Sequence, residues 1–314
     1  MPLGFNGKGD AQVIAKTSSQ SVVVIGAASQ IGYHLLPRLR EAGWDVAAIS
    51  RFPPPRDDRG ASWYRLDLRS SAALTQAGLH PSSLISLAPL AILSPSIGTL
   101  AALGTSRIIA FSSTSRYTKV DSADPVEREL AADFARAEEA LAAQCERHGI
   151  HWTIFRPTLV YSPGLDRNVS EIARFIRRFG CFPILGDGLG KRQPVHADDL
   201  ASACLAALGE SRAFDRAYNL SGGETLTYRE MVERIFNALG RAPRIIRVPP
   251  RLFKMAISAA HIVPRFRKLS PELVTRMNMD MCFDHDEAVR DLAFTPRSFA
   301  FRLVEEQESS GYAR

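Results

Sequence analysis

The sequence predicts an α/β protein in which a doubly wound parallel sheet is joined to a smaller C-terminal α/β domain. Short apolar runs alternate with helical patterns over residues 21–112, as in parallel sheets connected by right-handed helical crossovers. The second half instead places short strand-like runs between helices and glycine-rich turns. With 314 residues, the chain is long enough for one large domain or two smaller ones.

The strands of the first half are predicted in chain order. Residues 22–25 form an unbroken β-branched run, which is typical of a strand buried on both faces. A helix follows to about Leu39, and Gly43 ends it. Further strands are expected at 46–49, 63–64, 84–87, 107–111 and 151–155.

The clearest helix signal covers residues 125–148. Asp124 suits the N-cap, Pro125 the first helical position, and Glu127 a capping box. Apolar residues recur at steps of three and four, which predicts one helix face packed against the core. This stripe consists of Val126, Leu130, Phe134, Ala137, Leu141 and Cys145.

The second half predicts a less regular arrangement. Strands are expected at 182–185, 217–220 and 245–248, and helices at 168–178, 198–208, 227–239, 251–263 and 271–278. We therefore expect three regions along the chain. They are a flexible leader at 1–20, a core domain at 21–165, and a mainly substrate-binding part at 166–314 with segments that return to the core.

The composition excludes several classes of protein. A net charge of +6 favours anionic partners such as phosphates, but no long block of like charges indicates nucleic-acid binding. The four cysteines lie far apart, so we expect no zinc site and no disulfides, as in a cytoplasmic protein. No metal site is expected at 284–287 either, because these acids suit the start of a helix. The first residues lack a signal-peptide pattern, and the most apolar stretch is too short to span a bilayer.

The loop at 26–32 connects the first predicted strand to the first helix. Gly26 and Gly32 permit a sharp turn and a close approach of the backbone to a pyrophosphate, while the helix N-terminus offers N–H groups. Ser29 stands at the middle glycine position of the pattern and can hydrogen-bond phosphate. This context predicts a Rossmann-type NAD(P)-binding domain. The predicted loop contacts are Gly26, Ala28, Ser29, Gln30, Ile31 and Gly32.

The end of the second strand indicates which dinucleotide is bound. An acidic residue at that point binds the ribose hydroxyls of NAD, whereas this chain has Ser50 and Arg51. Serine and arginine suit a 2′-phosphate, so NADP(H) is favoured over NAD(H).

Several segments, in the expected order, resemble motifs of the extended and atypical short-chain dehydrogenase/reductases of the epimerase/dehydratase group. Besides the glycine loop, they are residues 65–68, 86–89, 111–117, 156–161 and 192–201, and the resemblance spans about 22–299. It implies an oxidoreductase acting on a carbonyl or hydroxyl. Further cofactor contacts implied are Arg51, Asp67, Leu68, Leu87, Ala88, Pro89, Ser112, Arg156 and Pro157. The implied contacts to a small, phosphate-bearing substrate, either nucleotide-sugar-like or lipid-linked, are Asn168, Arg192 and His196.

The chain departs from this family at the catalytic pair. Members that transfer hydride use Tyr-x-x-x-Lys on the long helix, where the tyrosine exchanges a proton with the substrate. The aligned residues here are Phe134 and Glu138. Thr114 resembles the retained catalytic hydroxyl, and Tyr117 and Lys119 are the nearest replacements. The simpler interpretation is that Tyr117 packs against its loop and Lys119 is solvated.

Three functions remain open. The first is an NADP(H)-dependent enzyme with relocated acid/base residues. The second is a non-catalytic NADP(H)-binding structural or sensor protein, since residues 193–196 and 294–299 resemble the nucleotide-binding accessory subunit of respiratory complex I. The third is a nucleotide-sugar epimerase or dehydratase that keeps NAD bound, and the missing tyrosine argues against it.

The resemblance and one amphipathic segment also suggest partners. Relatives pair through their long helices, which implies a homodimer. Residues 251–268 combine a broad apolar face with basic residues. Such a segment either covers the substrate-binding part, which we favour, or lies on a membrane surface.

Overall fold

The computed structural model describes residues 20–51, 59–67, 72–249 and 277–302. The predicted leader, Leu68, the helix at 251–263, most of the helix at 271–278 and the amphipathic segment 251–268 lie outside these residues. Within the described ranges, every helix is too short or too polar to cross a membrane.

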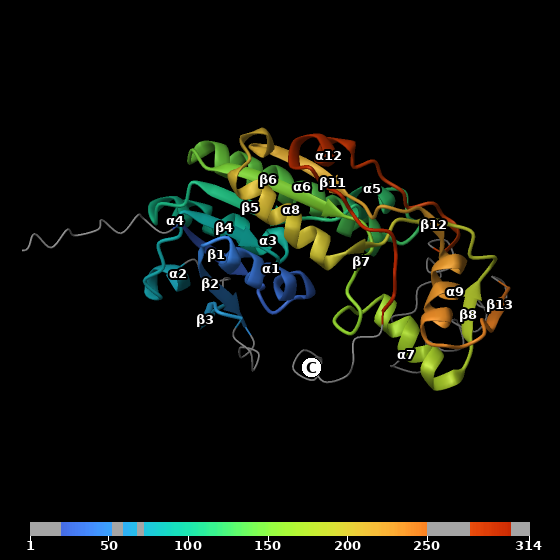
Figure 1. Ribbon diagram of the computed structural model, residues 1–314. Coiled ribbons are helices and arrows are strands. Elements are labelled where there is room, and N and C mark those ends of the chain that lie inside the picture. The colour runs from blue at the N-terminus through green and yellow to red at the C-terminus, as the bar shows by residue number, and fades with distance from the viewer. Residues whose placement is uncertain (1–19, 52–58, 68–71, 250–276, 303–314) are drawn as a thin grey trace, which may run out of the picture.

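A seven-stranded parallel sheet forms the centre of the larger part of the molecule (Figure 1), which confirms the predicted α/β fold class. Its strand order is β3-β2-β1-β4-β5-β6-β11. The bounds are β1 Ser21–Ile25, β2 Asp45–Ser50, β3 Ser62–Arg65, β4 Ser83–Ser86, β5 Arg107–Phe111, β6 His151–Pro157 and β11 Arg216–Leu220. Strands β2 and β3 extend the sheet on one side of β1, and β4, β5 and β6 extend it on the other side. A topological switch point therefore lies between β1 and β4.

The β-branched run of β1 is buried on both faces, as its sequence predicts. Val22 and Val24 belong to a core cluster on one side of the sheet, and Val23 and Ile25 to a cluster on the other. Helices α1 (Gln30–Glu41) and α8 (Ala197–Gly209) pack against each other on the first side. On the second side lie α3 (Leu90–Leu93), α4 (Ile97–Ala102) and α6 (Pro125–Arg147), and α2 (Ala72–Gln76) follows β3.

The smaller part has its own core. Helices α7 (Val169–Phe179) and α9 (Tyr228–Ala238) pack together, next to the parallel pair β8 (Phe182–Leu185) and β13 (Ile245–Val248). Two further strand pairs are β7 (Val160–Tyr161) with β10 (Val195–His196), and β9 (Lys191–Arg192) with β12 (Leu226–Thr227). Figure 1 shows α7, α9, β8 and β13 grouped at one end of the molecule, away from β1–β4.

The chain returns to the large sheet after entering the smaller part. Strand β11 pairs with β6 in parallel, from Arg216 against Thr153 to Leu220 against Pro157. Helix α8 precedes β11 in the sequence, and α12 (Asp286–Leu292) packs beside β11 and α8. The larger part is therefore completed by residues from the second half of the sequence.

Helix α6 has the predicted bounds but a different buried face. The carboxylate of Asp124 accepts a hydrogen bond from the backbone N–H of Val126 at 2.9 Å, as an N-cap should. The predicted stripe is wrong at its start, because Val126 is 73% exposed and Leu130 is 39% exposed. These first turns lie beside α5 (Ser115–Thr118), a helix too small to cover them. Further along, Glu138 is buried with Leu141 and Cys145.

Candidate functional site

A cleft of about 290 Å³ opens at the carboxyl ends of β1, β2 and β4. This position beside the switch point is where open α/β sheets bind ligands. Residues from the glycine loop, from the end of β2 and from the segment after β4 line it, and we call it the glycine-loop cleft. Its lining includes Gly26, Ala28, Ser29, Ser50, Arg51, Asp67, Leu87, Ala88 and Pro89.

The two glycines are needed by the turn itself. Gly26 has a φ of +72°, and a Cβ there would lie 3.2 Å from the backbone carbon of Leu87. A Cβ on Gly32 would lie 2.1 Å from the carbonyl oxygen of Ala27, so no side chain fits. The Ser29 hydroxyl caps α1 by accepting a hydrogen bond from the backbone N–H of Gly32 at 3.2 Å. Its own proton remains available for an anion.

The start of α1 suits the anionic part of a dinucleotide in this cleft. The first turn of α1 contains no acidic residue, so the positive end of its dipole is not neutralised locally. The side-chain oxygen of Gln30 is buried and has no hydrogen-bond partner in the described part of the chain. Gln30 does not line the cleft, so the start of α1 is the feature that favours a bound anion.

A second group of polar residues lies where β5 and β6 end. Thr114 is buried and donates a hydrogen bond from Oγ1 to the carbonyl oxygen of Pro157 at 3.1 Å. Arg156 lies next to Pro157 and donates from its guanidinium to the Tyr117 hydroxyl at 2.7 Å. Tyr117 is 42% exposed, and its ring lies 5.8 Å from that of Phe283. A phenol that is both exposed and held by a cation can exchange a proton with a ligand.

Glu138 holds this group together. Its carboxylate accepts hydrogen bonds from the Ser112 hydroxyl, from Arg116 and from Arg156, whose Nε lies 3.0 Å from Oε2 and 3.1 Å from Oε1. The Glu138 side chain is only 4% exposed, and Arg116 and Arg156 are 21% and 17% exposed. The sequence places Glu138 at the position of the family's lysine, but it does not indicate that two arginines surround this carboxylate.

Lys119 does not join Tyr117. Its ammonium group lies 3.4 Å from a carboxylate oxygen of Glu127, and its side chain is 15% exposed. The expectation of a solvated lysine is therefore wrong, because Glu127 at the start of α6 attracts it. Phe134 is half-buried.

The residues predicted to bind the substrate do not lie together at one site. Arg192 is buried, and its guanidinium donates to the carbonyl oxygens of Lys191 and Met279, each at 2.7 Å. Asn168 is exposed immediately before α7. Neither lines the glycine-loop cleft. Their contact with a substrate, like that of the cofactor residues with a nucleotide, stays a prediction.

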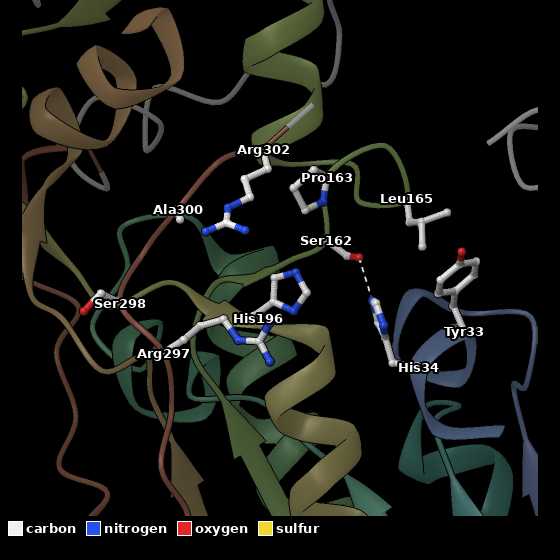
Figure 2. Close-up of a pocket in the computed structure, with 10 residues that line it drawn as sticks. All are labelled: Tyr33, His34, Ser162, Pro163, Leu165, His196, Arg297, Ser298, Ala300 and Arg302. Carbon is white, nitrogen blue, oxygen red and sulfur yellow. Dashed lines mark hydrogen bonds between the residues drawn. The ribbon is translucent and has the colours of Figure 1, made fainter. Parts of the chain in front are cut away.

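His196 lines a different cavity of about 440 Å³ (Figure 2). It lies between α1, the segment after β7, the start of α8 and residues 297–302, and we call it the two-histidine cavity. Sequence reasoning missed its other polar residues because they come from distant segments. Its lining is Tyr33, His34, Ser162, Pro163, Leu165, His196, Arg297, Ser298, Ala300 and Arg302.

The surroundings of this cavity lower the pKa of both histidines and so favour their neutral forms. Burial lowers the pKa of His34 to about 4, against a smaller opposing effect of Asp198. Burial and the charge of Arg297 also lower the pKa of His196. The His34 ring lies 3.1 Å from the Ser162 hydroxyl and 3.6 Å from a carboxylate oxygen of Asp198.

The low pKa of His34 predicts a loss of stability in acid. The unfolded chain binds a proton near the ordinary pKa of about 6.5, whereas the folded chain binds it near 4. The stabilising contribution is therefore complete above pH 6.5 and is lost as the pH falls toward 4. At about 1.4 kcal/mol per pKa unit, the shift corresponds to about 3 kcal/mol, which solvent screening of this partly exposed ring reduces. Urea unfolding across this range should give a shallower pH dependence for His34→Gln than for the wild type, and equal slopes would contradict the assignment.

Comparisons with known proteins agree with this architecture. The family model described as "NAD dependent epimerase/dehydratase family" matches residues 22–96 and 97–221. Among solved structures, UDP-glucose 4-epimerase of Thermus thermophilus in complex with NAD has a TM-score of 0.62 at 22% identity, covering 74% of this chain and 87% of that one. MoeE5 in complex with UDP-glucuronic acid and NAD has a TM-score of 0.68 at 22% identity, covering 89% and 94%. These structures support the fold.

Curated relatives match over shorter stretches. The uncharacterized protein y4nG of Sinorhizobium fredii is 30% identical over 195 residues, or 60% of this chain and 48% of the relative. The mitochondrial NADH dehydrogenase [ubiquinone] 1 alpha subcomplex subunit 9 of Arabidopsis thaliana is 31% identical over 39% of this chain and 29% of the relative. The match to 2'-dehydrokanamycin reductase of Streptomyces kanamyceticus is 26% identical over 73% and 69%. The chain thus spans half or less of the length of the first two.

Proposed function

Because the chain belongs to the NAD dependent epimerase/dehydratase family and has its NAD(P)-binding Rossmann fold, we propose that it is an NADP(H)-dependent oxidoreductase acting on a carbonyl or hydroxyl group. The observation that supports this most directly is the hydrogen bond from Arg156 to the Tyr117 hydroxyl, beside Thr114. The Tyr117 hydroxyl held in this way is a candidate proton donor in a chain whose long helix lacks the family's tyrosine. The name of one relative, 2'-dehydrokanamycin reductase, is in keeping with reduction of a carbonyl.

NADP(H), when bound, supplies or accepts the hydride at the reacting carbon. In the direction of reduction, the Tyr117 hydroxyl gives its proton to the carbonyl oxygen, on which negative charge develops. The Arg156 guanidinium, 2.7 Å from the phenolic oxygen, then stabilises the phenolate that remains. Glu138 fixes the orientation of Arg156 through its carboxylate. In the direction of oxidation the same phenolate accepts the proton.

The test is turnover of NADPH by the purified full-length chain. Absorbance of the reduced nicotinamide is followed with a panel of ketones, keto-sugars, sugar nucleotides and lipid-linked carbonyl compounds. Oxidation of NADPH with any of these compounds, with an equal amount of alcohol formed, supports the proposal. Tight NADPH binding without turnover on the whole panel contradicts it.

That second outcome would support a non-catalytic NADP(H)-binding protein. Phe134 and the buried Glu138 at the usual tyrosine and lysine positions favour this alternative. An epimerase or dehydratase would give a third outcome, because NAD would remain with the protein through purification and NADPH would not be consumed. Release of NAD on denaturation distinguishes it from the other two.

Arg51 is the residue expected to select the phosphorylated cofactor. It is exposed, follows β2 and lines the glycine-loop cleft. A charge-assisted hydrogen bond to a 2′-phosphate is worth about 1.5–3 kcal/mol, so Arg51→Ala should weaken NADPH binding about tenfold or more and leave NADH binding unchanged. Fluorescence titration of the reduced nicotinamide measures both affinities.

Arg65→Ala is the matched control for this experiment. Arg65 is exposed at the end of β3, near Arg51 in the sheet, but it does not line the cleft. An equal loss of NADPH affinity in both variants would indicate a general effect of positive charge. If Arg51→Ala weakened the binding of NADPH and of NADH equally, Arg51 would not be the residue that recognises the 2′-phosphate.

A further inference from the structure

We propose that the two-histidine cavity binds a small anionic molecule with an apolar body, at a site separate from the glycine-loop cleft. At about 440 Å³ the cavity has the size of a small-molecule site, which typically measures roughly 300–1,000 Å³. The two cavities share no lining residue. This proposal does not depend on the proposed oxidoreductase activity.

The charges around the cavity favour an anion. Its described lining contains two arginines and two histidines but no carboxylate. Of the neighbouring acids, buried Asp166 accepts hydrogen bonds from the backbone N–H of Ser162 and from the Ser170 hydroxyl, and Asp198 and Asp199 are paired with arginines. Asp198 lies 2.7 Å from Arg38 and 2.7 Å from Arg297, and Asp199 lies 2.7 Å from Arg297. Arg297 is thus largely neutralised, and burial lowers the pKa of both histidines, which favours their neutral forms.

Among the described lining residues, Arg302 is the cation left for a ligand. It is exposed, and it has no hydrogen-bond or ion-pair partner among the residues that the structure describes. Figure 2 shows its guanidinium group directed into the cavity, on the same side as His196 and Arg297. A guanidinium presents a planar fork of donors that matches a carboxylate or a phosphate.

The other lining residues indicate the chemistry of the rest of the ligand, beyond its anionic group. Pro163, Leu165 and Ala300 give the cavity apolar walls, and most of its surface is apolar. The Ser162 hydroxyl, in contact with His34, offers polar contacts at one side. We therefore infer a ligand with a carboxylate or phosphate at one end and a hydrocarbon body of moderate size.

Isothermal titration calorimetry of the full chain at pH 7.5 tests this inference with four probes. Octanoate and octyl phosphate have both the charge and the body, octanol has only the body, and inorganic phosphate has only the charge. We expect octanoate or octyl phosphate to bind about tenfold or more tightly than octanol and inorganic phosphate. The better of the two identifies the head group. No binding by either amphipathic anion, or equal binding of octanol, would overturn the proposal.

The variant Arg302→Gln locates the site. Because Arg302 is exposed and has no partner in the described ranges, its replacement should leave thermal unfolding unchanged and weaken the preferred probe about tenfold. Arg174→Gln removes an exposed arginine from α7 in the smaller part and is the matched control. NADPH should neither displace the probe nor bind differently to Arg302→Gln. Competition with NADPH, or an unchanged affinity of Arg302→Gln for the probe, would place the anion elsewhere and reject the site.

Discussion

Replacement of Tyr117 by phenylalanine is expected to reduce kcat/KM for carbonyl reduction by about 10²–10⁴-fold, the usual contribution of a positioned proton donor. The variant keeps the aromatic ring and its contact with Phe283, and it removes only the hydroxyl that Arg156 holds at 2.7 Å. NADPH affinity and the free energy of unfolding should not change. Steady-state kinetics on the best carbonyl substrate, together with NADPH titration, measures this effect.

Tyr64→Phe is the control for Tyr117→Phe. Tyr64 lies on β3, and its hydroxyl has no hydrogen-bond partner among the described residues. Full activity of Tyr117→Phe would remove this tyrosine from the mechanism. Loss of activity in parallel with NADPH affinity would assign Tyr117 to cofactor binding rather than to proton transfer.

Glu138→Gln is expected to lower the free energy of unfolding by about 3 kcal/mol or more, since breaking a buried ion pair leaves uncompensated charge. Two largely buried arginines, Arg116 and Arg156, share this one carboxylate. A glutamine keeps the shape and one acceptor oxygen but loses the negative charge. Glu138→Lys should cost still more, because it places a third cation between the two arginines. Urea unfolding at pH 7 measures both variants.

Glu139→Gln is the matched control, because the neighbouring Glu139 is exposed. It should change stability by no more than about 0.5 kcal/mol. If Glu138→Gln were as stable as the wild type, the three-residue cluster would not be needed for folding.

The parts of the fold that depend on local sequence were predicted correctly. The β-branched run of β1 and the glycine loop are continuous segments, so their burial and their turn follow from adjacent residues. Several residues predicted to contact the cofactor line the glycine-loop cleft, because parallel strands bring their carboxyl ends to one edge, and their contact with a nucleotide stays a prediction.

Features built from distant residues could not be predicted in this way. Nothing in the spacing of His34, His196 and Arg297 indicates that they surround one cavity. Likewise, a glutamate in the middle of a helix is normally expected on its solvated face, and only the approach of Arg116 and Arg156 makes burial of Glu138 favourable. The exposure of Val126 and Leu130 has the same origin, since periodicity specifies a helix face but not what lies opposite it.

The return of the chain to β6 through β11 has a consequence for biosynthesis. Because Arg216 pairs with Thr153, the last strand of the sheet emerges from the ribosome only after α7, β8 and β9 of the smaller part have been made. Until then β6 presents an unpaired edge, and α1 lacks the apolar face of α8 that packs on it. A nascent chain stopped near residue 165 would therefore expose both surfaces and be prone to aggregation. Non-local pairing of this kind slows folding, so chaperone dependence during synthesis is the expected cost of this topology.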